Sequence, residues 1–227
     1  GTKFYPLRNI ALEELPKGEK GDAGLYSLEK KSLKRCSEEL LNILKKKTGL
    51  SEYVKLPLIK PAVDFVLSTE GKGKIAKVIL VVTDQDDATE AQKQTDTVFF
   101  GEIIELILSQ QYGDKIAGWG RVVLKRSITL LDSMYEFFEN ELTVNKSFKS
   151  LGVDTPVYLF NTGGLQSTNT ALMFSLFERF ANVSQLTKPD GQRSAQLLSF
   201  PALYRRTILA HKVDAALEHY NYSRIAD

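Results

Sequence analysis

The stretch KVILVVTDQ, residues 77–85, decides the fold class of this chain of 227 residues. Its apolar run from Val78 to Val82 is typical of a strand in a parallel sheet that is buried on both faces. The run ends in three polar residues, TDQ, and a polar loop then leads to a helix predicted from Asp96 to about Gln111. Because such a strand needs helices to cover it, the stretch predicts an α/β fold.

A second segment repeats this order. Pro156 to Asn161 is predicted to be another buried strand, which passes through Thr162-Gly163-Gly164 into a helix from about Thr168 to Phe180. The alternation predicts an α/β sheet, mostly parallel, with helices on both faces, and a helix at Leu203–His219 extends it at the C-terminus. The other predicted elements are helices at 27–47, 61–67 and 130–142, a strand at 119–125, and two hairpin strands at 183–187 and 195–200.

The composition narrows the class of protein. Hydrophobic residues at 43% and charged residues at 26% are typical of a globular chain. The single cysteine, Cys36, excludes a disulfide framework and a zinc site built from several cysteines, and two histidines argue against a histidine-rich metal centre. We assign no metal and no cofactor. A net charge of +2 does not fit a protein that coats duplex DNA, and no run approaches the roughly 18 apolar residues of a membrane span. We expect a cytoplasmic protein without a membrane partner.

The loop after the second strand is the stronger candidate for ligand binding. Its two glycines, Gly163 and Gly164, let the backbone approach a ligand closely. The helix that follows would present unpaired N–H groups, which favour phosphate. A tight turn that needs no ligand explains the same residues equally well. The hydrogen-bonding side chains of this loop are Thr162, Gln166, Ser167, Thr168 and Asn169.

The loop after the first strand is acidic. Asp84, Asp86 and Asp87 could hold a divalent cation, but a solvated acidic loop is the favoured interpretation. Asp96 or Thr95 is expected to cap the next helix, and Asp96 is the favoured of the two. This loop alone therefore predicts no specific chemistry.

A nuclease site is the main catalytic alternative. Arg206 and His211 could share one face of the C-terminal helix and act on RNA, with the imidazole as acid or base. The spacing fits an ordinary amphipathic helix better, and no nucleophile–base pair is evident. We therefore favour binding over catalysis and assign no catalytic residue.

The order of these motifs resembles a known family. Thr83-Asp84-Gln85 ends a strand, Asp96-Thr97 opens a helix, and Asn161-Thr162-Gly163-Gly164 opens another. This order, over about residues 50–200, is similar to the CRISPR-associated Rossmann fold (CARF) domain. The first strand usual in the family has no clear counterpart before residue 75, and residues 1–50 match nothing in it.

The resemblance implies a Rossmann-like sheet and a sensor of cyclic oligoadenylate that binds the ring at a homodimer interface and regulates CRISPR antiviral defence. It implies a CARF-like domain at 51–200 and a helix at 201–227 that begins a linker to an effector. The segment at 1–50, with one amphipathic helix, has no counterpart in the family and is expected to be part of the same domain. A nuclease that cleaves the ring or RNA, and a Rossmann-like mononucleotide-binding domain, remain as alternatives. The ligand-binding residues that it implies are Thr83, Asp84, Gln85, Thr162, Gly163, Gly164, Gln166, Ser167, Thr168 and Asn169.

Overall fold

The computed structural model describes residues 3–4, 11–12, 32–46, 48–69, 73–126, 130–161, 165–189 and 193–199, with Tyr204, Arg206, Thr207, Ala210, His211, Val213 and Asp214 beyond them. Within these residues the helices are α2 (Leu33–Lys46), α3 (Ile59–Thr69), α4 (Glu90–Lys93), α5 (Val98–Tyr112), α6 (Leu131–Val144), α7 (Lys146–Lys149) and α8 (Gln166–Arg179), with 3-10 turns η2 (Thr48–Tyr53) and η3 (Gly113–Lys115). The strands are β1 (Lys3–Phe4), β2 (Ala11–Leu12), β3 (Val54–Lys55), β4 (Val78–Thr83), β5 (Trp119–Leu124), β6 (Val157–Phe160), β7 (Val183–Thr187) and β8 (Gln196–Leu198).

Two parallel strand pairs form the centre of the fold. β4 pairs with β5 from Val78↔Trp119 to Thr83↔Leu124, and β6 pairs with β7 in the same parallel sense. β8 then adds to β7 in the antiparallel sense, which confirms the predicted hairpin. The expected α/β architecture with parallel strands and covering helices is therefore present.

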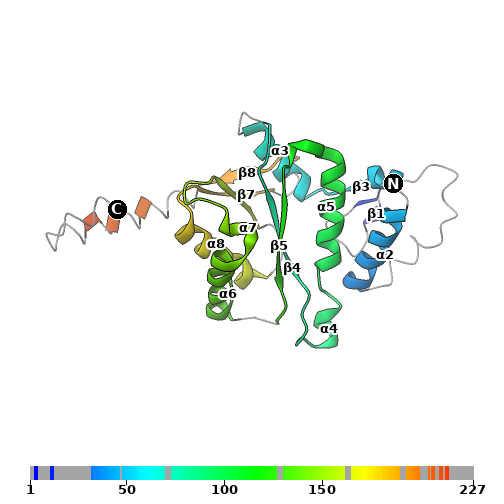
Figure 1. Ribbon diagram of the computed structural model, residues 1–227, viewed down its shortest axis with the longest axis horizontal. Coiled ribbons are helices and arrows are strands. Elements are labelled where there is room, and N and C mark those ends of the chain that lie inside the picture. Colours follow the sequence, from blue (N-terminus) through cyan, green and yellow to red (C-terminus); the bar gives the residue numbers. More distant parts are fainter. Residues whose placement is uncertain are drawn as a thin grey trace.

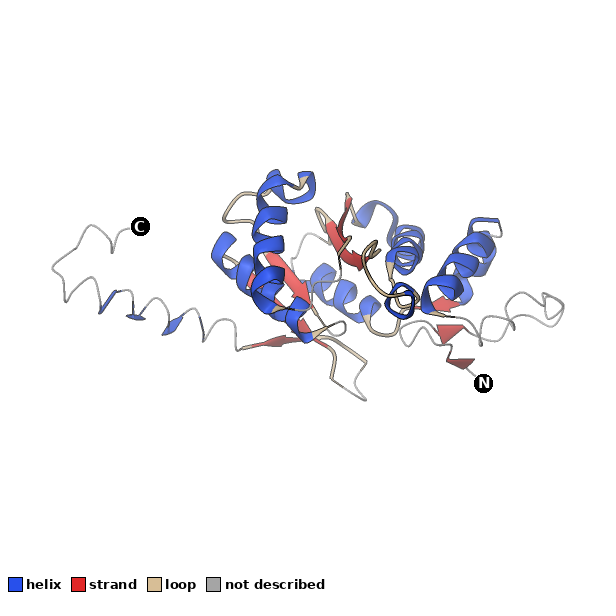
Figure 2. Cartoon of the chain, turned by 90° about the horizontal axis from the view of Figure 1, so that it is seen from below, coloured by secondary structure: helices blue, strands red, loops and turns tan. Residues whose placement is uncertain are grey.

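The side chains of β4 alternate between two cores, as the period of a strand requires. Val78 and Leu80 pack into a core that α2 and α5 supply, whereas Ile79 and Val81 pack into a second core with α6 and α8. Figure 1 shows the resulting layers, with α5 and α2 on one side of β4 and β5 and with α6 and α8 on the other. Figure 2 gives the same arrangement from below. The unbroken apolar run of β4 is explained by this double burial.

The second core also reaches the other parallel pair. Val157 and Leu159 of β6 and Val183 of β7 pack into it beneath α8. The opposite face of β6 and β7 packs against α3, through a third core that includes Leu186 and Phe160. β6 and β7 are therefore also covered by helices on both faces, whereas the residues of β8 are exposed.

One expectation about the sheet differs from the structure. A single mostly parallel sheet was expected, but hydrogen-bonded pairing among the described strands falls into three groups: β1-β2-β3, β4-β5 and β6-β7-β8. The first group is a small antiparallel sheet at the N-terminal side, where no strand was expected. Apolar periodicity marks a buried strand but carries no information on its neighbours, which depend on residues far away in the chain.

Most predicted elements lie within a few residues of the observed ones. The helices at α2, α3, α5, α6 and α8 and the strands at β4 to β8 are confirmed. Of the predicted C-terminal extension, the residues described between Tyr204 and Asp214 are helical, and the remainder lies outside the described residues. No helix in the described part of the chain is long and apolar enough to cross a membrane.

Candidate ligand-binding site

The end of β4 is held by a charged network of Lys34, Asp84, Asp96 and Lys125, which we call the lysine–aspartate network. The Nζ of Lys34 on α2 donates to Asp84 at 2.8 Å and to Asp96 at 3.2 Å. The Nζ of Lys125, just after β5, donates to the other oxygen of Asp84 at 2.6 Å. The two lysines therefore clamp the Asp84 carboxylate from either side and connect α2 to the ends of both strands.

Asp96 is the buried member of this network, with a fully buried side chain. Its carboxylate accepts hydrogen bonds from the main-chain N–H and the side-chain amide of Gln85 at 3.1–3.3 Å, besides the one from Lys34. The expectation that Asp96 caps the next helix is therefore wrong. Thr97 is the N-cap residue of α5 and makes no side-chain cap bond. The Asp96 carboxylate contacts Lys34 and Gln85 instead of the helix end, because a buried carboxylate without a cation and hydrogen-bond donors is strongly destabilising.

The electrostatics of the network favour its charged form. Hydrogen bonds from Lys125 and Lys34 lower the pKa of Asp84 below its ordinary value of 3.8. The hydrogen bond to Asp84 in turn raises the pKa of Lys34 above 10.5. Thr83 is also engaged, since its main-chain N–H donates to Thr97 Oγ1 at 2.9 Å. The three predicted ligand residues of this loop thus already serve to join β4 to α2 and α5.

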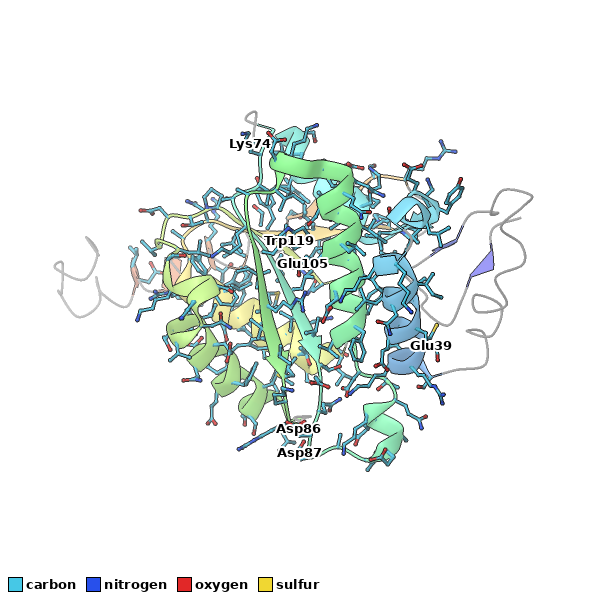
Figure 3. The ribbon with its side chains drawn as sticks, turned by 45° about the vertical axis from the view of Figure 1, so that its right-hand side comes forward. Glu39, Lys74, Asp86, Asp87, Glu105 and Trp119 are labelled. Carbon is cyan, nitrogen blue, oxygen red and sulfur yellow. The ribbon has the colours of Figure 1, made fainter. Side chains whose placement is uncertain are left out.

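The acidic residues of this loop do not gather around one point. Asp84 is occupied by two lysines, whereas Asp86 and Asp87 are exposed. Figure 3 shows these two at the end of the β4–β5 pair that is opposite to Lys74. In the described residues no group of three or more histidine, cysteine, aspartate or glutamate side chains is placed to hold a metal ion.

The second candidate loop follows β6. Thr162, Gly163 and Gly164 lie outside the described residues, so the loop is defined here by Asn161 before it and by α8 after it. Asn161 continues the face of β6 that α8 covers, one rung beyond Leu159. The amide of Asn169, in the first turn of α8, donates to the main-chain oxygen of Asn161 at 3.1 Å. The helix is thereby tied to the end of the strand.

A third amide completes this arrangement from the neighbouring strand. Gln185 of β7 is paired with Leu159, and its Nε2 donates to Asn161 Oδ1 at 2.9 Å. Val183, one rung earlier on the same face, belongs to the apolar core. The interior side of the sheet therefore changes from apolar to polar within one rung of β6 and β7.

A pocket of about 480 Å³ lies at this change, and we call it the amide pocket. Its volume falls within the roughly 300–1,000 Å³ that is usual for small-ligand sites. Most of the described residues that line it are polar, and these lining residues are Asn161, Gln166, Asn169, Thr170, Met173, Gln185 and Leu198.

The structure places the predicted residues in two separate locations. Gln166 and Asn169 line the amide pocket, and Ser167 and Thr168 stand half-buried between them in the first turn of α8. The described lining of the pocket contains nothing from Thr83–Gln85, which belong to the lysine–aspartate network. The two loops are therefore not brought together in one described pocket.

The pocket lining also includes residues that the sequence did not mark as ligand-binding: Asn161, Thr170, Met173, Gln185 and Leu198. Gln185 left a signal, since it is a polar residue on the covered face of a strand on which Val183 is apolar. In the sequence Met173 and Leu198 resemble ordinary core residues. The place of Leu198 in the pocket depends on the distant pairing of β8 with β7.

The residues of the nuclease alternative lie elsewhere. Arg206 and His211 are helical and exposed. Tyr204, at the start of the same segment, packs its ring against Phe174 and Phe177 of α8, with ring centroids 5.9 and 6.2 Å apart. Cys36 is fully buried in the α2–α5 core, as expected of a core residue.

Known proteins offer no further guide to this site. No protein-family model matches the chain, and no curated protein matches it. A functional assignment must therefore rest on the chemistry of the amide pocket and of the lysine–aspartate network.

Proposed function

We propose that this chain is a sensor domain that binds a cyclic oligoadenylate, with the amide pocket as the place where each chain receives one nucleotide of the ring. The observation that carries the proposal is a pocket lined by four neutral amides and two apolar side chains, together with Thr170, at the carboxyl end of a parallel strand. Ligands of α/β proteins bind at that end of the sheet. Neutral amides suit a nucleobase, because they offer donors and acceptors without charge.

The size of the pocket favours a shared ligand. A volume of about 480 Å³ suits a single nucleotide-sized group better than a complete oligonucleotide ring. A ring of identical nucleotides is symmetric, so two copies of the chain can each supply one pocket to it. The proposal therefore includes a two-fold homodimer. It also includes a Rossmann-like fold for each chain, as the CARF resemblance implies.

Exposed leucines next to the pocket support this arrangement. Leu165, immediately before α8, has 58% of its surface exposed, and Leu198 on the pocket wall has 38%. Contiguous apolar patches mark surfaces that another molecule covers, and we propose that these two leucines contribute to such a patch. A second copy of the chain that shares the ring would cover them.

The lysine–aspartate network has a supporting role in this proposal. Lysines balance the charges of Asp84 and Asp96, and Gln85 donates hydrogen bonds to Asp96, so these residues hold the edge of the sheet in place. A ligand that touched Thr83–Gln85 would meet groups that are already paired. The proposal accordingly centres binding on α8 and the strand ends of β6 and β7.

Binding assays separate the proposal from its alternatives. We expect cyclic tetra- or hexaadenylate to raise the melting temperature and to bind at micromolar concentration or better, because a ligand that binds only the folded state stabilises it. Gln166→Ala should weaken binding, whereas Gln110→Ala, on the exposed face of α5, should not. Equal binding of AMP and the ring would favour the mononucleotide-binding alternative, and no response to any adenylate would overturn the proposal.

A further inference from the structure

The amide pocket contains two polar side chains, Asn161 and Gln185, whose hydrogen-bonding capacity is only partly used. Gln185 Nε2 donates to Asn161 Oδ1 at 2.9 Å, and Asn169 Nδ2 donates to the main-chain oxygen of Asn161. A side-chain amide has two donor hydrogens on nitrogen and an acceptor oxygen. Among the described residues, Asn161 Nδ2 and Gln185 Oε1 therefore have no partner.

These two atoms form a matched pair. One is a donor and the other an acceptor, and the hydrogen bond from Gln185 Nε2 to Asn161 Oδ1 joins the two amides that carry them. Exchange of oxygen and nitrogen in both amides would again leave one donor and one acceptor. The pair is thus complementary to any flat group that offers an acceptor and a donor along one edge.

We infer that Asn161 and Gln185 read the base in this pocket and select an adenine by its amino edge. An adenine offers its 6-amino group as a donor beside a ring nitrogen as an acceptor, and asparagine and glutamine amides bind this edge in many complexes. Gln185 Oε1 accepts from the 6-amino group while Asn161 Nδ2 donates to the ring nitrogen. The inference rests on the proposed function and names the part of the ligand that the site selects.

The rest of the pocket fits a flat ring. Met173 on α8 and Leu198 on β8 supply apolar surface beside the amides. A polarizable thioether packs well against aromatic rings. Burial of the two amides under a base without a 6-amino group would leave the Gln185 oxygen unpaired, and such unpaired groups are how sites reject close analogues.

The test compares two rings: cyclic tetraadenylate, and the same ring with every adenine replaced by purine, which lacks the 6-amino group. For the unaltered chain we expect the adenine ring to bind 10- to 100-fold more tightly in calorimetric titration. In Gln185→Met the adenine ring should lose this advantage, with a preference below threefold, while the affinity for the purine ring stays within threefold of the original. Gln196→Met, on the neighbouring strand β8 and outside the described lining, should keep the full preference.

The outcomes test base reading and the sensor function separately. Equal affinity of the unaltered chain for both rings overturns base reading and leaves the sensor function in place. Absence of binding to either ring overturns the sensor function and the inference together. If Gln185→Met does not fold, as judged by circular dichroism, Asn161→Leu removes the other half of the pair, and the comparison of the two rings on the unaltered chain needs no variant.

Discussion

Lys34 is the residue on which the charged network depends. Asp96 is fully buried, and Lys34 is the cation that contacts both it and Asp84. Removal of one partner from a buried ion pair leaves an uncompensated charge, which costs about 3 kcal/mol or more. Lys34→Met should therefore lower the free energy of unfolding by about 3 kcal/mol, measured by urea denaturation.

A lysine on the same helix provides the control. Lys45 pairs with Glu102 at 3.1 Å, but more than half of its side chain is exposed. Exposed pairs contribute about 0–1 kcal/mol, so Lys45→Met should have a small effect. Recovery of stability in Lys34→Met with Asp96→Asn would confirm that the buried carboxylate causes the loss. Equal costs for the two lysines would show that burial of Asp96 is tolerated without a cation.

Asp84 should make the stability of the protein depend on pH. Its pKa is lowered in the folded state, so the folded protein binds the proton less readily than the unfolded chain does. Its contribution to stability is present above its ordinary pKa of 3.8 and is lost as pH falls through the lower, folded value. Asp84→Asn should therefore reduce the loss of stability between about pH 6 and pH 3.

The matched control for this titration is Asp114→Asn. Asp114 is 90% exposed and lies 4.0 Å from Lys74, so its replacement should leave the acid dependence unchanged. Urea denaturation at the two pH values measures both variants. An identical acid response in Asp84→Asn and the unaltered chain would contradict the role given to the two lysines.

At the scale of elements, α5 approaches β4 unusually closely, and Gly101 permits it. A Cβ placed on Gly101 would lie 2.7 Å from Cγ1 of Val82, well inside normal contact. Valine is stiff at χ1, so Val82 cannot turn away without strain. Gly101→Ala should destabilise the protein by about 1–2 kcal/mol despite the better helix propensity of alanine.

Gly49 serves as the comparison for this prediction. A Cβ placed on Gly49 would meet no atom within 4 Å, so Gly49→Ala should be close to neutral or slightly stabilising. Thermal melts of both variants measure the difference. A Gly101→Ala variant as stable as the original would mean that α5 can move away from β4 without loss of packing.

The elements that the sequence predicted well are those with an unbroken periodic pattern. The apolar run of β4 and the helical spacing of α5 and α6 depend on neighbours within the same segment, so they could be read from it. The short helix α4 was expected to be loop. Its signal was a capping box between Thr89 and Gln92, which is visible in the sequence but was obscured by the surrounding polar residues.

The site could be predicted only in part, for a related reason. The first turn of α8 was expected to bind ligand, and Gln166 and Asn169 indeed line the amide pocket. Gln185 and Leu198 reach the same pocket through the pairing of β7 with β6 and β8, which no local pattern encodes. Likewise, the engagement of Asp84 by Lys34 joins residues 50 positions apart.

At the scale of the whole molecule, the proposed sensor requires two copies. The parallel strand ends, the amide pocket and the exposed Leu165 lie on the same part of the fold, around the start of α8. A cyclic ligand that contacts two such pockets connects the binding of ligand to the association of chains. Ligand and dimer should therefore stabilise each other.

Leu165→Asp tests this coupling. A charge at a position that the second copy covers should prevent or weaken association, because burial of an unpaired carboxylate is costly. We expect the unaltered chain to be a dimer at micromolar concentration in light scattering and Leu165→Asp to be largely monomeric, with at least tenfold weaker binding of cyclic tetraadenylate. Val153→Asp, at an equally exposed valine before β6, should leave both properties unchanged. A Leu165→Asp variant that still forms dimers would place the interface elsewhere, and a monomeric variant with undiminished affinity would show that one chain binds the ring alone.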